Sequence, residues 1–185
     1  LDVVTRRWST PMIERLKLDA SLLPDLKESI EVTGTLTKAD TGTLTLGGAT
    51  TNTFSGNVNV NAGTLNLSKT TADAALGNSS VLTIASGATV NLTAGAASET
   101  LGSLAGLGTF NMLSSNTLTL ASNSTFDGTL NLNAGTLQLS GISLNLGTLN
   151  VTGNSTIDFA GANASLLVTN LNISVGVTLN IINWA

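Results

Sequence analysis

One twelve-residue phrase that occurs twice constrains the fold of this chain more than any other feature of its sequence. It is written GNVNVNAGTLNL at residues 56–67 and GTLNLNAGTLQL at residues 128–139. In both copies apolar residues alternate with small polar ones, the alternation breaks at Asn-Ala-Gly, and it then resumes. Strict alternation is the period of a half-buried β-strand. Gly63 and Gly135 stand where a chain that turns between strands often needs a positive φ. The phrase therefore predicts a strand, a corner and a second strand.

Looser copies of the alternating strand fill the rest of the C-terminal part. They lie at residues 42–46, 81–84, 88–92, 116–120, 147–151 and 177–181. A short strand that recurs with turn residues between its copies is typical of a stacked array, in which each coil covers the open face of its neighbour. We therefore predict an all-β fold, a right-handed parallel β-helix (β-solenoid), with a short helical or irregular N-terminal segment. The side chains expected to stack inside the β-helix are Leu44, Leu46, Val58, Val60, Leu65, Leu67, Val90, Leu92, Leu118, Leu120, Leu130, Leu132, Leu137 and Leu139.

Charge divides the chain near residue 38. Residues 1–38 hold 6 of the 7 basic and 6 of the 11 acidic residues, whereas residues 39–185 carry Lys69 against five acids. In the first part Pro11 suits an initial helical turn, and apolar residues follow at helical spacing. This apolar stripe is too small to fold alone. We therefore predict two parts, a helical or irregular segment at residues 1–38 and a β-solenoid at residues 39–185, with the first part available as a cap for the array. The residues of the predicted helical stripe are Met12, Ile13 and Leu16.

The composition lacks the side chains on which most reaction centres depend. The chain has no His, no Cys and no Tyr, and only 10% of its residues are charged. Without Cys there are no disulfides or thiolate metal sites, and without His the commonest general base near neutral pH is missing. The formal net charge of −4 argues against nucleic-acid binding, and no apolar run reaches the roughly 18 to 20 residues of a membrane-spanning helix. We expect no enzyme activity, no catalytic, cofactor-binding or metal-binding residues, and no cofactor.

A catalytic, calcium-binding or ice-binding role for the polar residues is less well supported by the sequence than a purely structural role. A glycosidase or lyase needs paired carboxylates, but Asp127 and Asp158 belong to different copies and are expected to be solvated or turn-capping. A calcium-binding roll needs Gly-Gly-x-Gly-x-Asp, and Gly47-Gly48 has no such aspartate after it. Ice binding would use Thr-x-Thr triplets, but irregular intervals separate those at residues 35–37, 43–45 and 117–119.

The chain end has its own expectations. Trp184 follows the apolar Leu179, Ile181 and Ile182, so we expect it in the core or as a capping aromatic rather than as a platform for a ligand. We also expect the chain to continue beyond Ala185.

Residues 6–37 resemble part of the N-terminal domain of FGGY-family carbohydrate kinases, xylulose kinases in particular. The resemblance rests on Trp8-Ser9, Leu16-Lys17-Leu18-Asp19, Leu22-Leu23-Pro24 and Val32-Thr33-Gly34-Thr35-Leu36-Thr37. After Thr37 the chain departs from that family, and the phosphate-binding glycine loops and catalytic aspartate have no counterpart here. The resemblance therefore implies a truncated kinase fragment, fused or misjoined to the repeats and without kinase activity, and a cytoplasmic location if the segment reflects its origin.

Residues 39–185 resemble the autotransporter-associated β-strand repeats of bacterial surface and passenger proteins. The resemblance is carried by Thr41-Gly42-Thr43-Leu44-Thr45-Leu46-Gly47-Gly48, Thr53-Phe54-Ser55-Gly56 and Val60-Asn61-Ala62-Gly63-Thr64-Leu65-Asn66-Leu67, and it weakens toward the C-terminus. It implies a non-enzymatic extracellular or cell-surface protein, a structural or adhesive β-solenoid of the passenger type. Expected partners are components of cell surfaces or of the matrix, with no nucleic acid and no transmembrane segment in this chain.

Overall fold

The structure of the protein is a computed structural model that describes residues 14–15, 17, 34–113, 115–161 and 163–184. The chain divides into two units, Leu1–Glu31 and Val32–Ala185. In the first unit only Glu14 and Arg15, which are helical, and Lys17 are described. The predicted helical stripe at Met12, Ile13 and Leu16 and nearly all of the kinase-like segment therefore lie outside the described residues. Among the described residues, no helix is long and apolar enough to cross a membrane.

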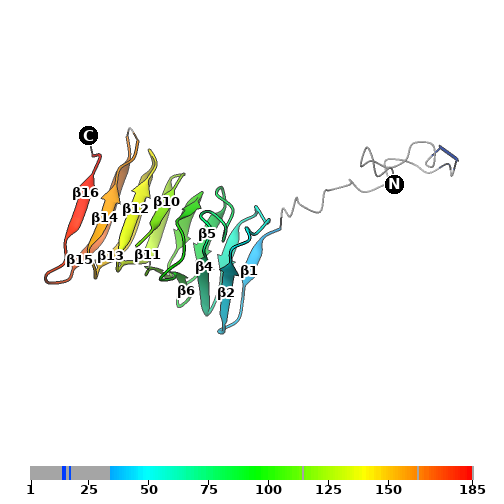
Figure 1. Cartoon of the computed structure of the whole chain (residues 1–185), viewed down its shortest axis with the longest axis horizontal. Helices are drawn as coiled ribbons and strands as arrows, with labels where there is room; N and C mark the ends of the chain where they lie inside the picture. Colours follow the sequence, from blue (N-terminus) through cyan, green and yellow to red (C-terminus); the bar gives the residue numbers. More distant parts are fainter. Residues whose placement is uncertain (1–13, 16, 18–33, 114, 162, 185) are drawn as a thin grey trace. The chain divides into compact units, whose positions relative to one another are not determined.

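The second unit is an all-β parallel solenoid of about seven turns (Figure 1). All strand pairs identified in its described residues are parallel and join one turn to the next. This confirms the predicted all-β parallel β-solenoid. The strands are β1 (Leu36–Lys38), β2 (Thr43–Gly48), β3 (Val58–Val60), β4 (Thr64–Lys69), β5 (Val81–Ile84), β6 (Thr89–Leu92), β7 (Glu99–Leu101), β8 (Ser103–Gly106), β9 (Thr109–Met112), β10 (Thr117–Leu120), β11 (Ser124–Leu132), β12 (Gly135–Leu139), β13 (Ser143–Val151), β14 (Ser155–Asp158), β15 (Ser165–Ile173) and β16 (Leu179–Ile182).

The strands form three faces, which the chain visits in the same order in each turn. Face A contains β1, β3, β5, β8 and the first halves of β11, β13 and β15, and face B contains β2, β4, β6, β9 and the second halves of those three long strands. Face C contains β7, β10, β12, β14 and β16. Faces A and B belong to one sheet because the long strands run round the corner between them, with a register shift between Phe126 and Thr129 in β11.

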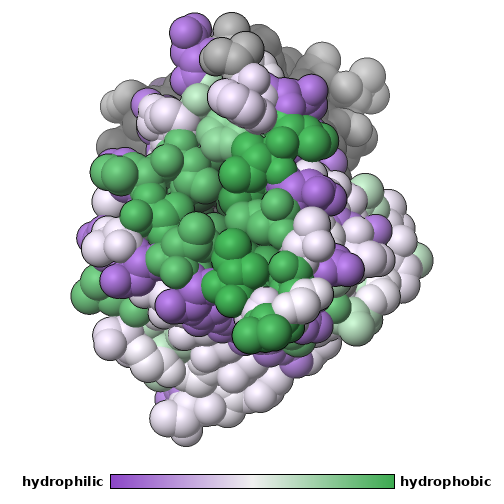
Figure 2. All heavy atoms as spheres, turned by 90° about the vertical axis from the view of Figure 1, so that its left-hand side faces the viewer, coloured by the Kyte–Doolittle hydropathy of each residue, from purple (hydrophilic) through white to green (hydrophobic). Residues whose placement is uncertain are grey.

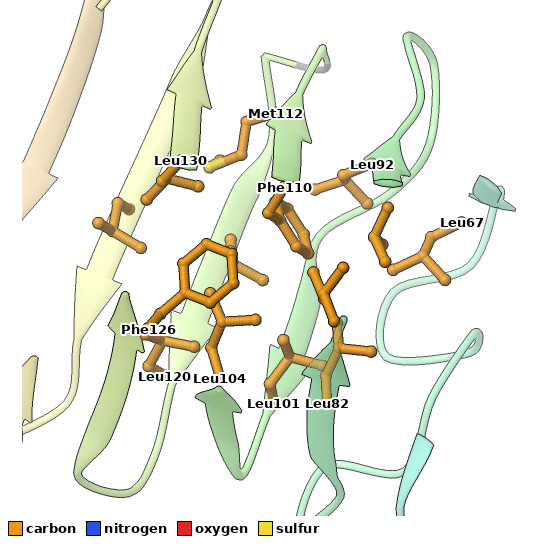
Figure 3. Close-up of a cluster of buried hydrophobic side chains, with 14 of the residues drawn as sticks. Leu67, Leu82, Leu92, Leu101, Leu104, Phe110, Met112, Leu120, Phe126 and Leu130 are labelled. Carbon is orange, nitrogen blue, oxygen red and sulfur yellow. The ribbon is translucent and has the colours of Figure 1, made fainter. Parts of the chain in front are cut away.

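The core is a column of apolar side chains that stack from turn to turn. In β12 the pattern follows the alternation of the sequence: Leu137 and Leu139 are buried, whereas Thr136 and Gln138 are partly exposed. Figure 3 shows Phe110, Phe126 and neighbouring leucines gathered in the interior. Burying each leucine or valine contributes about 1.5 to 3 kcal/mol. All the side chains predicted to point inward do so, and only Leu44 and Leu46, in the first turn, are partly rather than fully buried.

The two copies of the twelve-residue phrase both form strand, corner and strand, but at different corners of the solenoid. In the first copy, Asn61-Ala62-Gly63 turns the chain from face A (β3) to face B (β4). In the second copy, Asn133-Ala134-Gly135 turns it from face B (β11) to face C (β12). Both glycines have positive φ, 69° for Gly63 and 83° for Gly135. One local sequence therefore serves two corners, because each corner needs the same backbone conformation.

The first two turns are irregular on face C. Residues 49–57 contain a single bridge residue, Phe54, and residues 70–80 contain no strand. The regular face C begins only with β7 in the third turn. In the last described turn Trp184 is 74% exposed, so the expected core position is wrong, and the alternative that it caps the array stays a prediction.

Candidate functional site

The two repeat aspartates do not converge. Asp127 is exposed in β11, at the corner between faces A and B, whereas Asp158 lies in β14 on face C. Asp158 accepts hydrogen bonds from Gln138 Nε2 at 3.0 Å and from Asn183 Nδ2 at 2.7 Å. Its carboxylate thus links three neighbouring turns of face C, which is a structural use of the group. No cluster of three or more His, Cys, Asp or Glu side chains suited to a metal ion occurs in the described part of the chain.

Glu99 is a buried carboxyl group that the sequence analysis did not single out. It points inward from β7 and is 2% exposed. Its two carboxylate oxygens accept hydrogen bonds from the backbone N–H of Leu76 at 2.7 Å and of Ala75 at 3.2 Å. These amides belong to the irregular segment of the preceding turn, where no strand on face C pairs with them. Glu99 therefore replaces missing ladder hydrogen bonds.

Burial raises the pKa of Glu99 from 4.5 to about 7. Desolvation of the charged form is the largest cause, the hydrogen bonds from Leu76 and Ala75 oppose it, and the nearby charge of Asp73 adds to the rise. Such a pKa is also found in general acids and bases. Here, however, the carboxyl group lies in the core and its oxygens are engaged by backbone amides, so the geometry assigns it to the fold rather than to a reaction.

Two lysines also point inward and bond to backbone carbonyl groups. Lys69, at the end of β4, donates from Nζ to the carbonyl oxygen of Thr50 at 2.5 Å. Lys38, at the end of β1, donates to the carbonyl oxygens of Asp40 and Ala62. The alternation in the sequence predicts that both lysines point inward, because each stands two positions after an inward leucine. Like Glu99, they serve backbone groups in the less regular first turns.

A ladder of six asparagines runs along the surface of face B. From the second asparagine onward, each amide Nδ2 donates to the Oδ1 of the asparagine in the preceding turn at 2.6 to 2.8 Å, and the sequence separations are 19 to 25 residues. At the start of the ladder, the first asparagine donates to Thr45 Oγ1 at 3.5 Å. The ladder amides bond to one another, so the row stiffens the stack. Its members are Asn66, Asn91, Asn111, Asn131, Asn150 and Asn172.

Threonines form a second row on face B beside the asparagine ladder. The residues in register are Thr43, Thr64, Thr89, Thr109, Thr129 and Thr148. The Thr-x-Thr triplets considered for ice binding, however, lie on three different faces: residues 35–37 on face A, 43–45 on face B and 117–119 on face C. They do not form one aligned array, which agrees with the irregular intervals between them in the sequence.

Comparison with known protein families finds a match to parts of the repeat region. Residues 36–67 and 106–139 match the passenger-associated-transport-repeat family. Neither the curated proteins nor the solved structures include a significant match to this chain. Nothing in these comparisons supports the resemblance of residues 6–37 to a carbohydrate kinase.

The two matched segments each span five consecutive faces of the solenoid but start on different faces. The first begins with β1 on face A and ends with β4 on face B, whereas the second begins as the chain leaves face A and ends with β12 on face C. Two segments of the β-solenoid thus match passenger-associated transport repeats, which is consistent with a passenger-type region of an autotransporter and with a secreted or surface protein.

Proposed function

We propose that this chain is a non-enzymatic, extracellular or cell-surface solenoid that holds a rigid adhesive or structural surface away from its attachment point. The observation that carries the proposal is the asparagine ladder, which runs without a break from Asn66 to Asn172. A ladder of that length requires every turn between its ends to keep the same register. The ladder therefore favours a role in which the solenoid acts as a long, straight and stiff element.

The physical properties of the solenoid fit this role. Parallel strands of adjacent turns lie about 4.8 Å apart, so seven turns extend for about 30 Å. In a stacked array each turn is stabilised by its neighbours, and length can be added without a larger core. The outer rows of threonine and asparagine carry little charge and many hydroxyl and amide groups, which can form hydrogen bonds to polar partners such as the glycans and proteins of cell surfaces or of the matrix.

The location is tested on intact cells of the organism that produces the protein. Antibodies raised against the full chain should label unpermeabilised cells, and protease added outside the cells should remove the label while a cytoplasmic marker survives. A label that appears only after permeabilisation would reject the proposed location.

Adhesion is tested separately from location. Beads coated with the full chain should bind to host cells or to matrix glycoproteins above the level of beads coated with a heat-unfolded sample of the same chain. If native and unfolded coatings bind equally, the adhesive part of the proposal fails and the structural part alone is retained.

A further inference from the structure

Glu99 stands at the start of an inward row of face C whose next members are apolar. The row continues through Leu118, Leu137 and Ile157, which are all buried. Figure 2 faces the last described turn, where the apolar character of the interior is visible. A carboxyl group in such a row is costly, because its charged form loses water without gaining an equally polar environment.

On its other side Glu99 meets residues 70–80, the segment of the preceding turn that contains no strand. Ala75 and Leu76 in this segment are buried, and their N–H groups donate to the carboxylate. The same segment is joined to the turn before it through Asn52, whose Nδ2 donates to the carbonyl oxygen of Ala75 at 3.0 Å. The Glu99 side chain thus stands in for the strand ladder that joins later turns on face C.

The bonds to the Glu99 carboxylate in the described structure come from these backbone amides rather than from a basic side chain. Between residues 41 and 126 the charged side chains are Lys69, Asp73 and Glu99. Lys69 donates from Nζ to the carbonyl oxygen of Thr50, and the charge of Asp73 disfavours a second negative charge nearby. An ionised Glu99 is therefore a buried charge that two amide dipoles stabilise.

Opening of residues 70–80 would expose Glu99 to water and so couple the opening to its protonation. The pKa of the carboxyl is about 7 in the closed structure, and hydration returns it toward its ordinary value of 4.5. Closing therefore takes up a proton between these two values. The closed segment has its full advantage below pH 4.5 and loses it as the pH rises through about 7.

We propose that Glu99 and residues 70–80 form a pH-controlled latch between the irregular first two turns and the regular part of face C. Under acidic conditions the protonated carboxyl keeps the segment closed, and its carbonyl oxygen still accepts a hydrogen bond from Leu76. Ionisation at neutral to alkaline pH lets residues 70–80 detach from β7, while β10, β12 and β14 stay folded. The latch is a local opening with a lower free energy than global unfolding, and it does not depend on the proposed adhesive role.

The first test is amide hydrogen exchange of the full chain between pH 5 and 8, with each rate divided by the intrinsic rate at that pH. The protection of Ala75 and Leu76 should fall by about tenfold to seventyfold over this range. The amide of Ser140, which donates to the carbonyl oxygen of Leu120 on face C, should change less. Glu99→Gln should remove the pH dependence at both latch amides.

Two results of the exchange experiment would overturn the proposal. One is protection of Ala75 and Leu76 that does not change with pH. The other is an opening free energy and a urea dependence equal to those of Ser140, because these would show that the segment opens only when the whole solenoid unfolds.

The second test measures access to the latch by thiol labelling. The chain has no cysteine, so Ala75→Cys introduces a single thiol in the segment. Ala88→Cys is the matched control, because Ala88 is also 1% exposed but lies at the corner between β5 and β6. After correction for the ionisation of a free thiol, labelling of Ala75→Cys should rise by about tenfold or more between pH 5 and 8 relative to the control. An equal pH dependence of the two thiols would refute the latch.

Discussion

Protonation of Glu99 should make the solenoid more stable at mildly acidic pH than at neutral pH. The pKa of this buried carboxyl is about 7 in the folded chain, against an ordinary value of 4.5. Between these two values the folded state keeps a proton that the unfolded state has lost, so folding takes up a proton. The free energy of unfolding must therefore fall as the pH rises from about 4.5 to about 7.

The size of the effect follows from the same two values. A rise from 4.5 to about 7, at about 1.4 kcal/mol per pKa unit, corresponds to about 3 kcal/mol. Because Glu99 is 2% exposed, solvent screens this difference little. The loss is complete near pH 8, where both states are ionised, and the full stabilisation is present only below pH 4.5, where both states are protonated.

Urea unfolding of the full chain between pH 4.5 and 8, followed by circular dichroism of the β-sheet, measures this change. Glu99→Gln removes the ionisable group and leaves one carbonyl oxygen for the amides of Ala75 and Leu76. The variant should lack the fall in stability between pH 5 and 7 that the wild type shows. Asp127→Asn, which removes an exposed carboxylate, should keep the wild-type profile. Parallel profiles for the wild type and Glu99→Gln would refute the assignment of the pH dependence to Glu99.

Three further predictions compare substitutions at matched positions, each measured as the change in free energy of unfolding. Leu137→Asp should cost several kcal/mol because it buries an unpaired charge, whereas Thr136→Asp on the same strand should cost little. Equal costs for the two variants would show that the register of β12 is wrong. Gly153→Ala should destabilise by about 1 to 3 kcal/mol, since an added Cβ would lie 1.8 Å from the carbonyl oxygen of Asn133. Gly42→Ala should be neutral or slightly stabilising, because nothing lies within 4 Å of its added Cβ, and similar effects of the two alanines would contradict the packing described here. Asn111→Ala removes the ladder hydrogen bonds to Asn91 and Asn131 and should cost about 1 to 2 kcal/mol. The control is Asn145→Ala on face A, and a loss of stability for Asn111→Ala no larger than for this control would show that the ladder adds no stability.

The local features of the solenoid could be predicted from the sequence because they depend on a short period. Alternation of apolar and polar residues placed Leu137 inside and Gln138 outside, since successive side chains of a strand point to opposite sides. Asn-Ala-Gly predicted both corners, since Gly63 and Gly135 supply the positive φ that each corner needs. The same alternation would also have placed Lys38, Lys69 and Glu99 inside, had it been applied to charged residues as strictly as to leucines.

Only the tertiary structure decided which residues of different turns meet. The turns differ in length, so the asparagines of the ladder are 19 to 25 residues apart, and no fixed sequence period aligns them. For the same reason two nearly identical phrases lie at different corners, one between faces A and B and the other between faces B and C. Trp184 is likewise exposed although its neighbours in the sequence are apolar. A sequence determines the direction of each side chain through backbone geometry, whereas stacking of turns of unequal length determines its neighbours.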